Sequence, residues 1–343
     1  MTSSTEKNHR IRRRSLLTAG AALPLVSLIN YPASAAQFNY KLATGQDPTH
    51  PNNVRAQQAI ERIAKASNGQ LQMKLFPANQ LGADTDLLSQ VRDGGVQFFT
   101  LATSILATFV PVCGIVNTGF AFPDYKAVWM AMDGKLGEYV RNAVNKSGIV
   151  AVTKLMDNGF RQITSSTKPI NTPADLKGFK IRVPPAPMLT SLFQALGAGP
   201  APINFNEVYS ALQTKVVEGE ENGLSIVYTA RLYEVQKYCS MTSHVWDGYL
   251  TLGNRASWAA LPKNLQEIVL RELGVAADEQ RKDVAAADLS LRKTLTEKGL
   301  VFNDPDRKPF QAALSNTTYY KNWKGKYGAE AWGLLEQYAG KLA

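Results

Sequence analysis

The sequence contains few of the side chains on which metal sites and many catalytic sites depend. Its 343 residues include only two cysteines and three histidines. Cys113 and Cys239 are far apart and outside any C-x-x-C motif, which predicts two buried thiols and no disulfide framework. No two histidines have the spacing of metal ligands. We therefore expect no metal site, no catalytic histidine and no cofactor.

Familiar catalytic motifs are also missing. The chain has no G-x-S-x-G, no H-E-x-x-H and no glycine-rich nucleotide loop. The net charge is +10, but lysine and arginine are spread along the chain without interleaved aromatic clusters, which argues against nucleic-acid binding. A diffuse positive field of this kind favours small anions as ligands.

Hydrophobic runs long enough to span a bilayer are absent, and the apolar run from Leu16 to Ile29 is shorter than the roughly 18 residues required. Five basic residues precede it, and Ala33-Ser34-Ala35 follows as an A-x-A cleavage site. This order predicts a signal peptide over residues 1–35 and a soluble mature protein in the periplasm. RRSLL at 13–17 resembles a twin-arginine export signal. Because Arg12 stands where such signals usually have serine or threonine, ordinary Sec export is one alternative, and an unprocessed basic anchor is another.

The sequence does contain a repeated strand and helix pattern. Strand patterns occur over residues 38–43, 71–75, 96–101, 148–156 and 179–183. Helical patterns occur over 54–66, 84–91, 125–145, 188–196, 207–216, 257–296 and 319–342. The alternation predicts an α/β fold with parallel strands, and the length suffices for two domains.

Two arginines lie where strands are predicted to end. Arg182 stands in an alternating strand that Pro184 stops, and Arg161 follows the strand pattern over 148–156. Ligands of parallel α/β sheets bind beyond the carboxyl ends of the strands. Because a guanidinium matches a carboxylate bidentately, both arginines are candidates to hold an acid.

The segment VVEGEENGL, residues 216–224, places two glycines around three acids and Asn222. Asn222 can both donate and accept hydrogen bonds to a ligand, and a glutamate beside a cationic pocket can fix an arginine rotamer. The alternative is a turn with solvated acids. Glu218, Glu220 and Glu221 are also possible partners of the two arginines in purely structural ion pairs.

Several long stretches together resemble the solute-binding proteins of tripartite ATP-independent periplasmic (TRAP) transporters, the DctP family. They are FPANQLGADTDLLSQVRDGGVQF, NGFRQITSS, ADLKGFKIRVPPAPMLTSLFQALGAGPAPINFNEVYSALQTKVVEGEENG and YEVQKYCSMTSHVWDGYL. The resemblance implies a two-lobed α/β fold with a ligand cleft between the lobes and a long helix spanning them. It also implies a protein that captures a small organic acid without chemistry and delivers it to a TRAP membrane permease.

The resemblance further implies roles for individual residues. Arg182 takes the place of the arginine that binds the ligand carboxylate, and Arg161 that of a second contributing arginine. Asn222 matches the asparagine after the acid in the family's DGQEN stretch, and Glu221 matches the glutamate that precedes it. Phe205 matches an aromatic residue that lines the pocket.

The chain departs from the family pattern at three positions. Glu220 replaces an amide, and Gly223 replaces a proline, which predicts a looser turn after Asn222. Thr103, a small group, occupies the position of a polar substrate contact in some members. These changes concern the shape of the ligand and leave the identity of the acid open.

We expect lobe 1 to comprise residues 36–156 plus about 249–286, and lobe 2 residues 157–248 plus about 287–343. The helical stretch after Ser257 would cross between them, and we expect a monomer. One alternative function is a secreted α/β enzyme acting on an anionic substrate, with Glu218, Glu220 or Glu221 as general base. Another is a sensor that presents its closed, ligand-bound form to a receptor.

Overall fold

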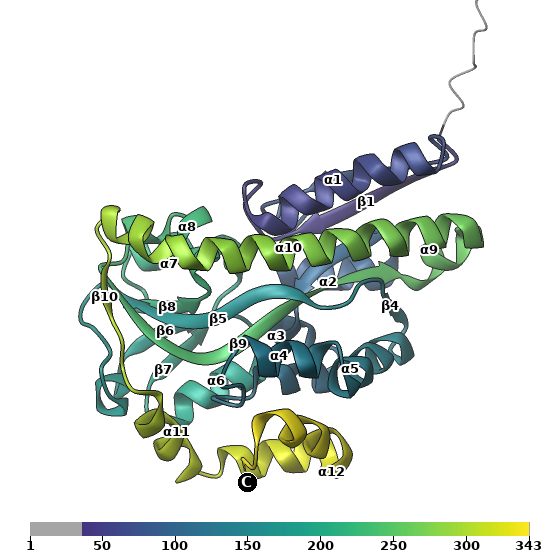
Figure 1. Ribbon diagram of the computed structural model, residues 1–343. Coiled ribbons are helices and arrows are strands. Elements are labelled where there is room, and N and C mark those ends of the chain that lie inside the picture. Colours follow the sequence, from purple (N-terminus) through teal and green to yellow (C-terminus); the bar gives the residue numbers. More distant parts are fainter. Residues whose placement is uncertain (1–35, 343) are drawn as a thin grey trace, which may run out of the picture. The chain divides into compact units, whose positions relative to one another are not determined.

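The computed structural model describes residues 36–342, in which strands and helices alternate as the sequence predicts (Figure 1). The predicted signal peptide lies outside the described residues. Within them, no helix is both long and apolar enough to cross a membrane. Cys113 and Cys239 are buried free thiols, which confirms that prediction.

One mixed sheet runs through this part of the chain in the order β2-β1-β3-β9-β5-β8-β6-β7, with β4 and β10 also paired to β9. The strands are β1 (Phe38–Thr44), β2 (Leu71–Phe76), β3 (Phe98–Ala102), β4 (Ile149–Ala151), β5 (Met156–Ser165), β6 (Lys180–Val183), β7 (Gly199–Pro202), β8 (Gly219–Asn222), β9 (Tyr238–Asn254) and β10 (Val301–Asn303). The prediction of parallel strands is right for β1 with β2 and β3, and for β6 with β7 and β8. It is wrong at the centre, where β9 is antiparallel to β3, β4 and β5, and β5 is antiparallel to β8. The reason is that β5 and β9 are long strands shared by both halves of the sheet, and not members of single β-α-β units.

Helices flank this sheet (Figure 1). They are α1 (Pro51–Ala66), α2 (Asp84–Asp93), α3 (Thr103–Leu106), α4 (Tyr125–Met132), α5 (Lys135–Lys146), α6 (Pro187–Ala195), α7 (Val208–Gln213), α8 (Leu224–Thr229), α9 (Arg255–Ala260), α10 (Lys263–Glu297), α11 (Arg307–Ser315) and α12 (Tyr319–Ala339). The 3-10 helices are η1 (Pro111–Asn117), η2 (Pro173–Leu176), η3 (Phe205–Glu207) and η4 (Leu232–Glu234).

Three local predictions need correction. The helix predicted over 125–145 is two helices, because Gly134 has an extended backbone conformation and begins α5 as its N-cap. The strand pattern over 148–156 contains the short strand β4 and only the first residue of β5. Part of the acidic 216–224 segment is the buried strand β8 and not a solvated turn, since β5 and β6 pair with it on both sides.

Helix α10 joins two apolar clusters. Near its start, Leu265 and Val269 pack with Ile63 of α1, and near its end Leu291 and Leu295 pack in the cluster of α7 and α8. The long helix predicted for the fold is therefore present, and Figure 1 shows it running beside α1 and on toward α8. The residue bounds of the two lobes stay a prediction.

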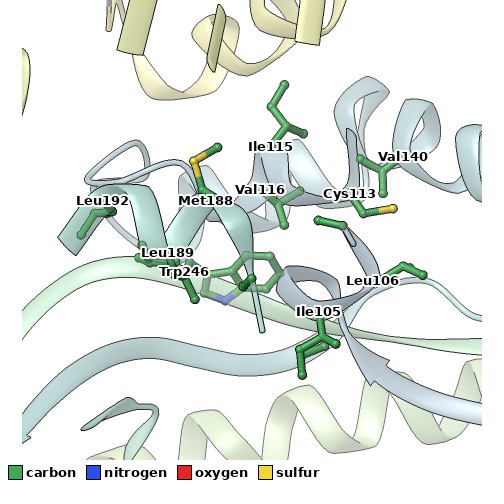
Figure 2. Packing of buried hydrophobic residues seen from close by; sticks show 14 of the residues in the cluster. Ile105, Leu106, Cys113, Ile115, Val116, Val140, Met188, Leu189, Leu192 and Trp246 are labelled. Atoms are coloured by element: carbon green, nitrogen blue, oxygen red, sulfur yellow. The ribbon is translucent and has the colours of Figure 1, made fainter. Parts of the chain in front are cut away.

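The largest cluster is formed mainly by residues of α3 to α6, η1, α11 and α12 and of the central strands, and Ala277 of α10 also belongs to it. Figure 2 shows part of it, with Ile105 of α3, Val116 of η1, Met188 and Leu189 of α6, and Trp246 of β9. Packing between α6 and the segment around α3 holds the strand ends β3 and β6 in fixed positions.

Gly219 is required for the close pairing of β8. A Cβ at this position would lie 2.2 Å from the Thr164 carbonyl oxygen and 2.6 Å from Cζ of Phe179. We expect Gly219→Ala to lower the free energy of unfolding by about 1–3 kcal/mol through overpacking. Gly274→Ala in α10 is the matched control, because nothing lies within 4 Å of its added Cβ, and helix propensity predicts a gain of up to about 1 kcal/mol. Urea unfolding of the mature chain measures both, and equal effects of the two substitutions would contradict this packing argument.

His50 makes the stability depend on pH. It is the N-cap of α1, where Nδ1 accepts a hydrogen bond from Asn52 N at 3.2 Å, and its burial lowers its pKa to about 3. Because the pKa of the unfolded state is higher, near 6.5, the neutral ring stabilises the fold at pH 7, and this contribution is lost as pH falls below about 6.5. We expect a loss of about 2 kcal/mol between pH 7 and pH 5. His50→Asn keeps a side-chain cap and should flatten this part of the profile in urea unfolding; an unchanged profile would mean that other groups cause the dependence.

Candidate ligand-binding site

One pocket has walls from two separate parts of the sequence. Its lining residues are Gln46, Asp84, Leu101, Ala102, Ser104, Ile105, Asn158, Arg161, Arg182, Pro184, Phe205, Asn222, Ile226 and Tyr249. Residues 46–105 belong to the range predicted as lobe 1, and residues 158–226 to the range predicted as lobe 2. Of the six predicted site residues, Arg161, Arg182, Phe205 and Asn222 line the pocket.

Arg182 on β6 is a buried cation with an open end. Its side chain is about 1% exposed, and its Nε donates to the Ile203 carbonyl oxygen at 2.9 Å. Within residues 36–342, Nη1 and Nη2 have neither a hydrogen bond nor an ion pair. Burial lowers the pKa of Arg182 to about 10, although the nearby Glu220 charge opposes this effect. The Phe205 ring lies 5.9 Å from its Cζ. The free edge of the guanidinium can therefore take an anion.

Arg161 lines the same pocket, but protein acids occupy its guanidinium. Nε and Nη2 meet the two carboxylate oxygens of Glu221 at 2.5 and 2.8 Å, and Nη1 lies 3.5 Å from Oδ2 of Asp247. Burial would lower the pKa of Arg161, but the charges and hydrogen bonds of Glu221 and Asp247 outweigh it and raise the pKa. The structure also corrects the placement of Arg161, which lies inside β5 and not at a strand end.

Glu221 lies behind Arg161 and does not line the pocket. Its Oε2 is also 3.1 Å from Nε2 of His244. Burial raises the pKa of Glu221, but the charges of Arg161 and His244 reverse the effect and lower it. Glu221 therefore holds the guanidinium of Arg161 in place, as expected of a glutamate that fixes an arginine rotamer.

The carboxylate of Asp247 in β9 accepts hydrogen bonds from the hydroxyl groups of the α3 turn. It accepts hydrogen bonds from Thr103 Oγ1 at 2.8 Å, Ser104 Oγ at 2.7 Å and Asn117 Nδ2 at 2.8 Å. Asn158 Nδ2 donates to it at 3.3 Å. Thr103 is thus fully buried against Asp247, and its neighbour Ser104 lines the pocket.

Glu220 orients the amide of Asn222. Its carboxylate accepts from Thr164 Oγ1 at 2.8 Å and from Asn222 Nδ2 at 2.5 Å. Burial raises the pKa of Glu220, and the charge of Arg182 opposes this shift. Because an ionised carboxylate only accepts, it holds the amide nitrogen of Asn222 toward itself. The side-chain oxygen of Asn222 accepts no hydrogen bond within residues 36–342.

Gly223 has a packing role that the sequence did not indicate. A Cβ there would lie 2.3 Å from the Asn158 carbonyl oxygen. Asn158 is the extra residue of a β-bulge, since Asp157 pairs with Gly248 and Gly159 with Asp247. The glycine thus lets the end of β8 approach the bulge closely.

Sequence reasoning missed several pocket residues. Asp84 is buried in the first turn of α2, where Asn79 Nδ2 donates to its Oδ1 at 2.9 Å. An acid in a first helical turn is common, so the pattern gave no sign of a ligand role. Gln46 lies in a loop and Asn158 in a β-bulge. Neither has the hydrophobic periodicity of a helix or strand, so the sequence pattern could not predict that these residues line the pocket. Asp247 was detectable as a charge within the apolar stretch VWDGYL.

The family model described as bacterial extracellular solute-binding protein, family 7 (DctP) matches residues 42–324. The chain therefore belongs to this family of transport proteins. It is 32% identical to the 2,3-diketo-L-gulonate-binding periplasmic protein YiaO of Escherichia coli over 86% of this chain and 89% of that protein.

Solved structures agree with this assignment. A TRAP periplasmic solute-binding protein from Sulfurospirillum deleyianum with bound succinate is 28% identical, with a TM-score of 0.83 and coverage of 89% of this chain and 99% of that one. The sugar acid binding protein DctPAm from Advenella mimigardefordensis in complex with galactonate is 26% identical, with a TM-score of 0.85 and coverage of 90% and 100%. The predicted α/β solute-binding fold and the predicted family are thereby confirmed.

The unequal partnering of the two arginines predicts unequal effects on stability. Arg161→Met leaves Glu221 and Asp247 buried without their cation, and we expect it to lower the free energy of unfolding by about 3–5 kcal/mol. Arg182→Met removes a buried cation that has no ion pair within residues 36–342, so it should cost less than half as much. Urea unfolding of the ligand-free mature protein measures both variants. A larger loss for Arg182→Met would mean that its charge stabilises the unliganded fold.

Proposed function

We propose that the protein captures a small organic acid in the pocket between its two predicted lobes and delivers it to a TRAP membrane permease. Arg182 binds the ligand carboxylate, with Asn222 and Phe205 beside it and Arg161, held by Glu221, completing the wall. Export across the inner membrane precedes this role, so the protein acts in the periplasm. The single observation that carries the proposal is the buried Arg182 guanidinium, whose Nη atoms lack a partner within residues 36–342.

The physical support is the cost of an unmatched buried charge. A guanidinium removed from water is stable when an anion and further hydrogen bonds replace the lost solvent. A carboxylate presents two oxygens with the spacing of two guanidinium N–H groups, so it fits the free edge of Arg182. The bound acids named for the three relatives, a diketo sugar acid, succinate and galactonate, share this group.

Binding without catalysis is also favoured by the state of the acidic residues. Glu221, one candidate general base, has a lowered pKa and is occupied by Arg161 and His244. Glu220, the other buried candidate, accepts from Thr164 and Asn222 and does not line the pocket. A general base must reach the proton that it removes. We therefore propose that the bound acid leaves unchanged.

One hydrogen bond joins the two predicted lobes directly, so its formation can be used to detect closure of the pocket. Asn204 Nδ2 donates to Thr85 Oγ1 at 3.2 Å, which connects the segment before η3 with α2. The two residues belong to the two different predicted lobes. This contact supports hinge closure around the ligand as the way in which the permease distinguishes loaded from empty protein.

The test is a binding screen of the mature protein, from Ala36 onward, against organic acids and their neutral amides. A ligand that binds only the folded state raises its stability by about 2.7 kcal/mol at a hundredfold excess over the dissociation constant. Arg182→Met should weaken binding of the responding acid by about 2–5 kcal/mol, which is roughly thirtyfold or more. Arg92→Met is the control, because that guanidinium lies over Phe109 outside the pocket.

Equal responses to an acid and its amide, or Arg182→Met binding within a fewfold of wild type, would refute the proposed anchor. A second readout is the chemical identity of the acid recovered after long incubation with the protein. A changed product would favour an enzyme, and loss of uptake on deletion of the gene would support delivery to a permease over a purely sensory role.

A further inference from the structure

We propose that the acid carried by this protein is a polyhydroxylated monocarboxylate, such as an aldonate, and that the pocket rejects dicarboxylates. This inference rests on the proposed function, because it assumes that Arg182 binds a carboxylate in this pocket. The basis is the balance of hydrogen-bond donors and acceptors that the pocket offers to its ligand.

The pocket offers a free cation for one carboxylate only. Arg161 and Arg182 are the basic residues among the lining residues. Arg161 is bound to Glu221 through two nitrogens and its third lies beside Asp247, so its charge is already matched by two buried protein acids and a second carboxylate would find no unmatched cation there. Removing one partner from such a pair is strongly unfavourable, because it leaves the other charge buried and unpaired. A dicarboxylate would therefore have one end without a counter-charge.

A second carboxylate would also meet an acid in the opposite wall. Asp84 is 4% exposed and lines the pocket. Asn79 holds its Oδ1, while Oδ2 has no hydrogen-bond partner within residues 36–342. Two carboxylates in one desolvated site repel each other. A ligand hydroxyl, in contrast, can donate to the open oxygen of Asp84.

Two further acceptors in the walls have no donor. Gln46 Oε1 and Asn158 Oδ1 are buried without any partner in the described part of the chain, and both residues line the pocket. The orientation of Asn158 is fixed, because its Nδ2 donates to Asp247. Buried acceptors without donors are rare in native proteins, because their lost hydration is not compensated by a hydrogen bond. A ligand that supplies donors removes this cost.

The side-chain oxygen of Asn222 is a third amide acceptor that has no donor within residues 36–342. Glu220 holds the nitrogen of this amide at 2.5 Å, so the carbonyl end remains for the ligand. Glu220, where the family pattern has an amide, thus fixes which end of the Asn222 side-chain amide faces the ligand. Because Asn222 lies beside Arg182, whose strand β6 pairs with β8, its natural partner is a hydroxyl close to the bound carboxylate.

The sum of these groups matches one class of ligand. Arg182 supplies charged donors at one end, and Asn222, Asn158, Gln46 and Asp84 supply acceptors elsewhere in the walls. A dicarboxylate without hydroxyls, such as succinate, carries acceptors only and would leave all four unsatisfied. A chain of carbons with one carboxylate and several hydroxyls donates to them, while Leu101, Ile105 and Ile226 contact its C–H groups.

The experiment uses matched ligands on the mature wild-type protein, with calorimetry or thermal shift as the readout. D-galactonate is compared with galactarate, in which a second carboxylate replaces the terminal CH2OH group and the hydroxyls at C2 to C5 are kept. D-Erythronate is compared with butyrate, which keeps the carboxylate but lacks hydroxyls, and succinate is the plain dicarboxylate. We expect at least one of the two hydroxy acids to bind, and its matched partner and succinate to bind about 100-fold more weakly or worse.

Asp84→Asn tests the charge that excludes the second carboxylate. Asparagine has the same shape and can donate, so galactarate should gain at least about tenfold relative to D-galactonate. Asp86→Asn is the matched control, because it removes the same charge from an exposed position of the same helix outside the pocket, and it should leave that ratio unchanged. An unchanged ratio in Asp84→Asn, or an equal change in both variants, would refute the role of Asp84.

The outcomes separate this inference from the function on which it rests. Tight binding of succinate, butyrate or galactarate, with loss in Arg182→Met, would overturn the inference and leave acid capture intact. Silence with every acid in the panel would overturn both. Binding of the hydroxy acids that persists in Arg182→Met would mean that hydroxyl recognition is real but the carboxylate lies elsewhere.

Discussion

The buried ion pair between Arg161 and Glu221 is the interaction on which the rest of the pocket depends. Both carboxylate oxygens of Glu221 are used, and the third guanidinium nitrogen lies beside Asp247. Because this cluster is closed, it holds β5, β8 and β9 in register around two carboxylates that would otherwise repel each other. Arg182, in contrast, has no acid within ion-pair distance among residues 36–342. The two arginines therefore differ in charge balance, since only the charge of Arg161 is matched, by Glu221 and Asp247.

The central strands explain how the asymmetry is built. β9 is a single strand of 17 residues that pairs with β3 near one end and with β5 and β10 near the other. Asp247 lies in its middle and binds the hydroxyls of the α3 turn, and His244 lies three residues away against Glu221. One strand therefore ties the wall that contains Ser104 to the wall that contains Arg161. On the proposed hinge closure, rotation of one wall relative to the other would be absorbed near this strand and near α10.

The sequence was informative where patterns are local. The outer β-α-β units and Arg182 in a strand ended by Pro184 could be predicted, because alternation and proline chemistry depend on neighbours in the chain. The pocket position of Phe205 was implied by the family resemblance alone. β9 escaped prediction, because nearly all of its residues are buried and period-two alternation disappears when both faces are covered. Arg161 was placed at a strand end for a related reason, since the bulge at Asn158 hides the continuity of β5. Thr103 was one residue away from Ser104, the residue that lines the pocket, and nothing in a four-residue helix fixes which side chain faces inward.

The open guanidinium also bears on how closure can depend on ligand. When Arg182 is buried without a counter-ion, its desolvation lowers its pKa to about 10, which means that the surroundings disfavour its charge. Any closed, empty state carries this cost, and the unpartnered oxygens of Gln46 and Asn158 add to it. An open state would return these groups to water. A ligand shifts such an equilibrium only by its differential affinity for the two states. On the proposed function and ligand class, a carboxylate with hydroxyls would have that differential affinity, because in the closed state it would satisfy the groups that make the empty closed state unfavourable. The polar groups that reduce the stability of the unliganded protein would then make closure selective for the ligand.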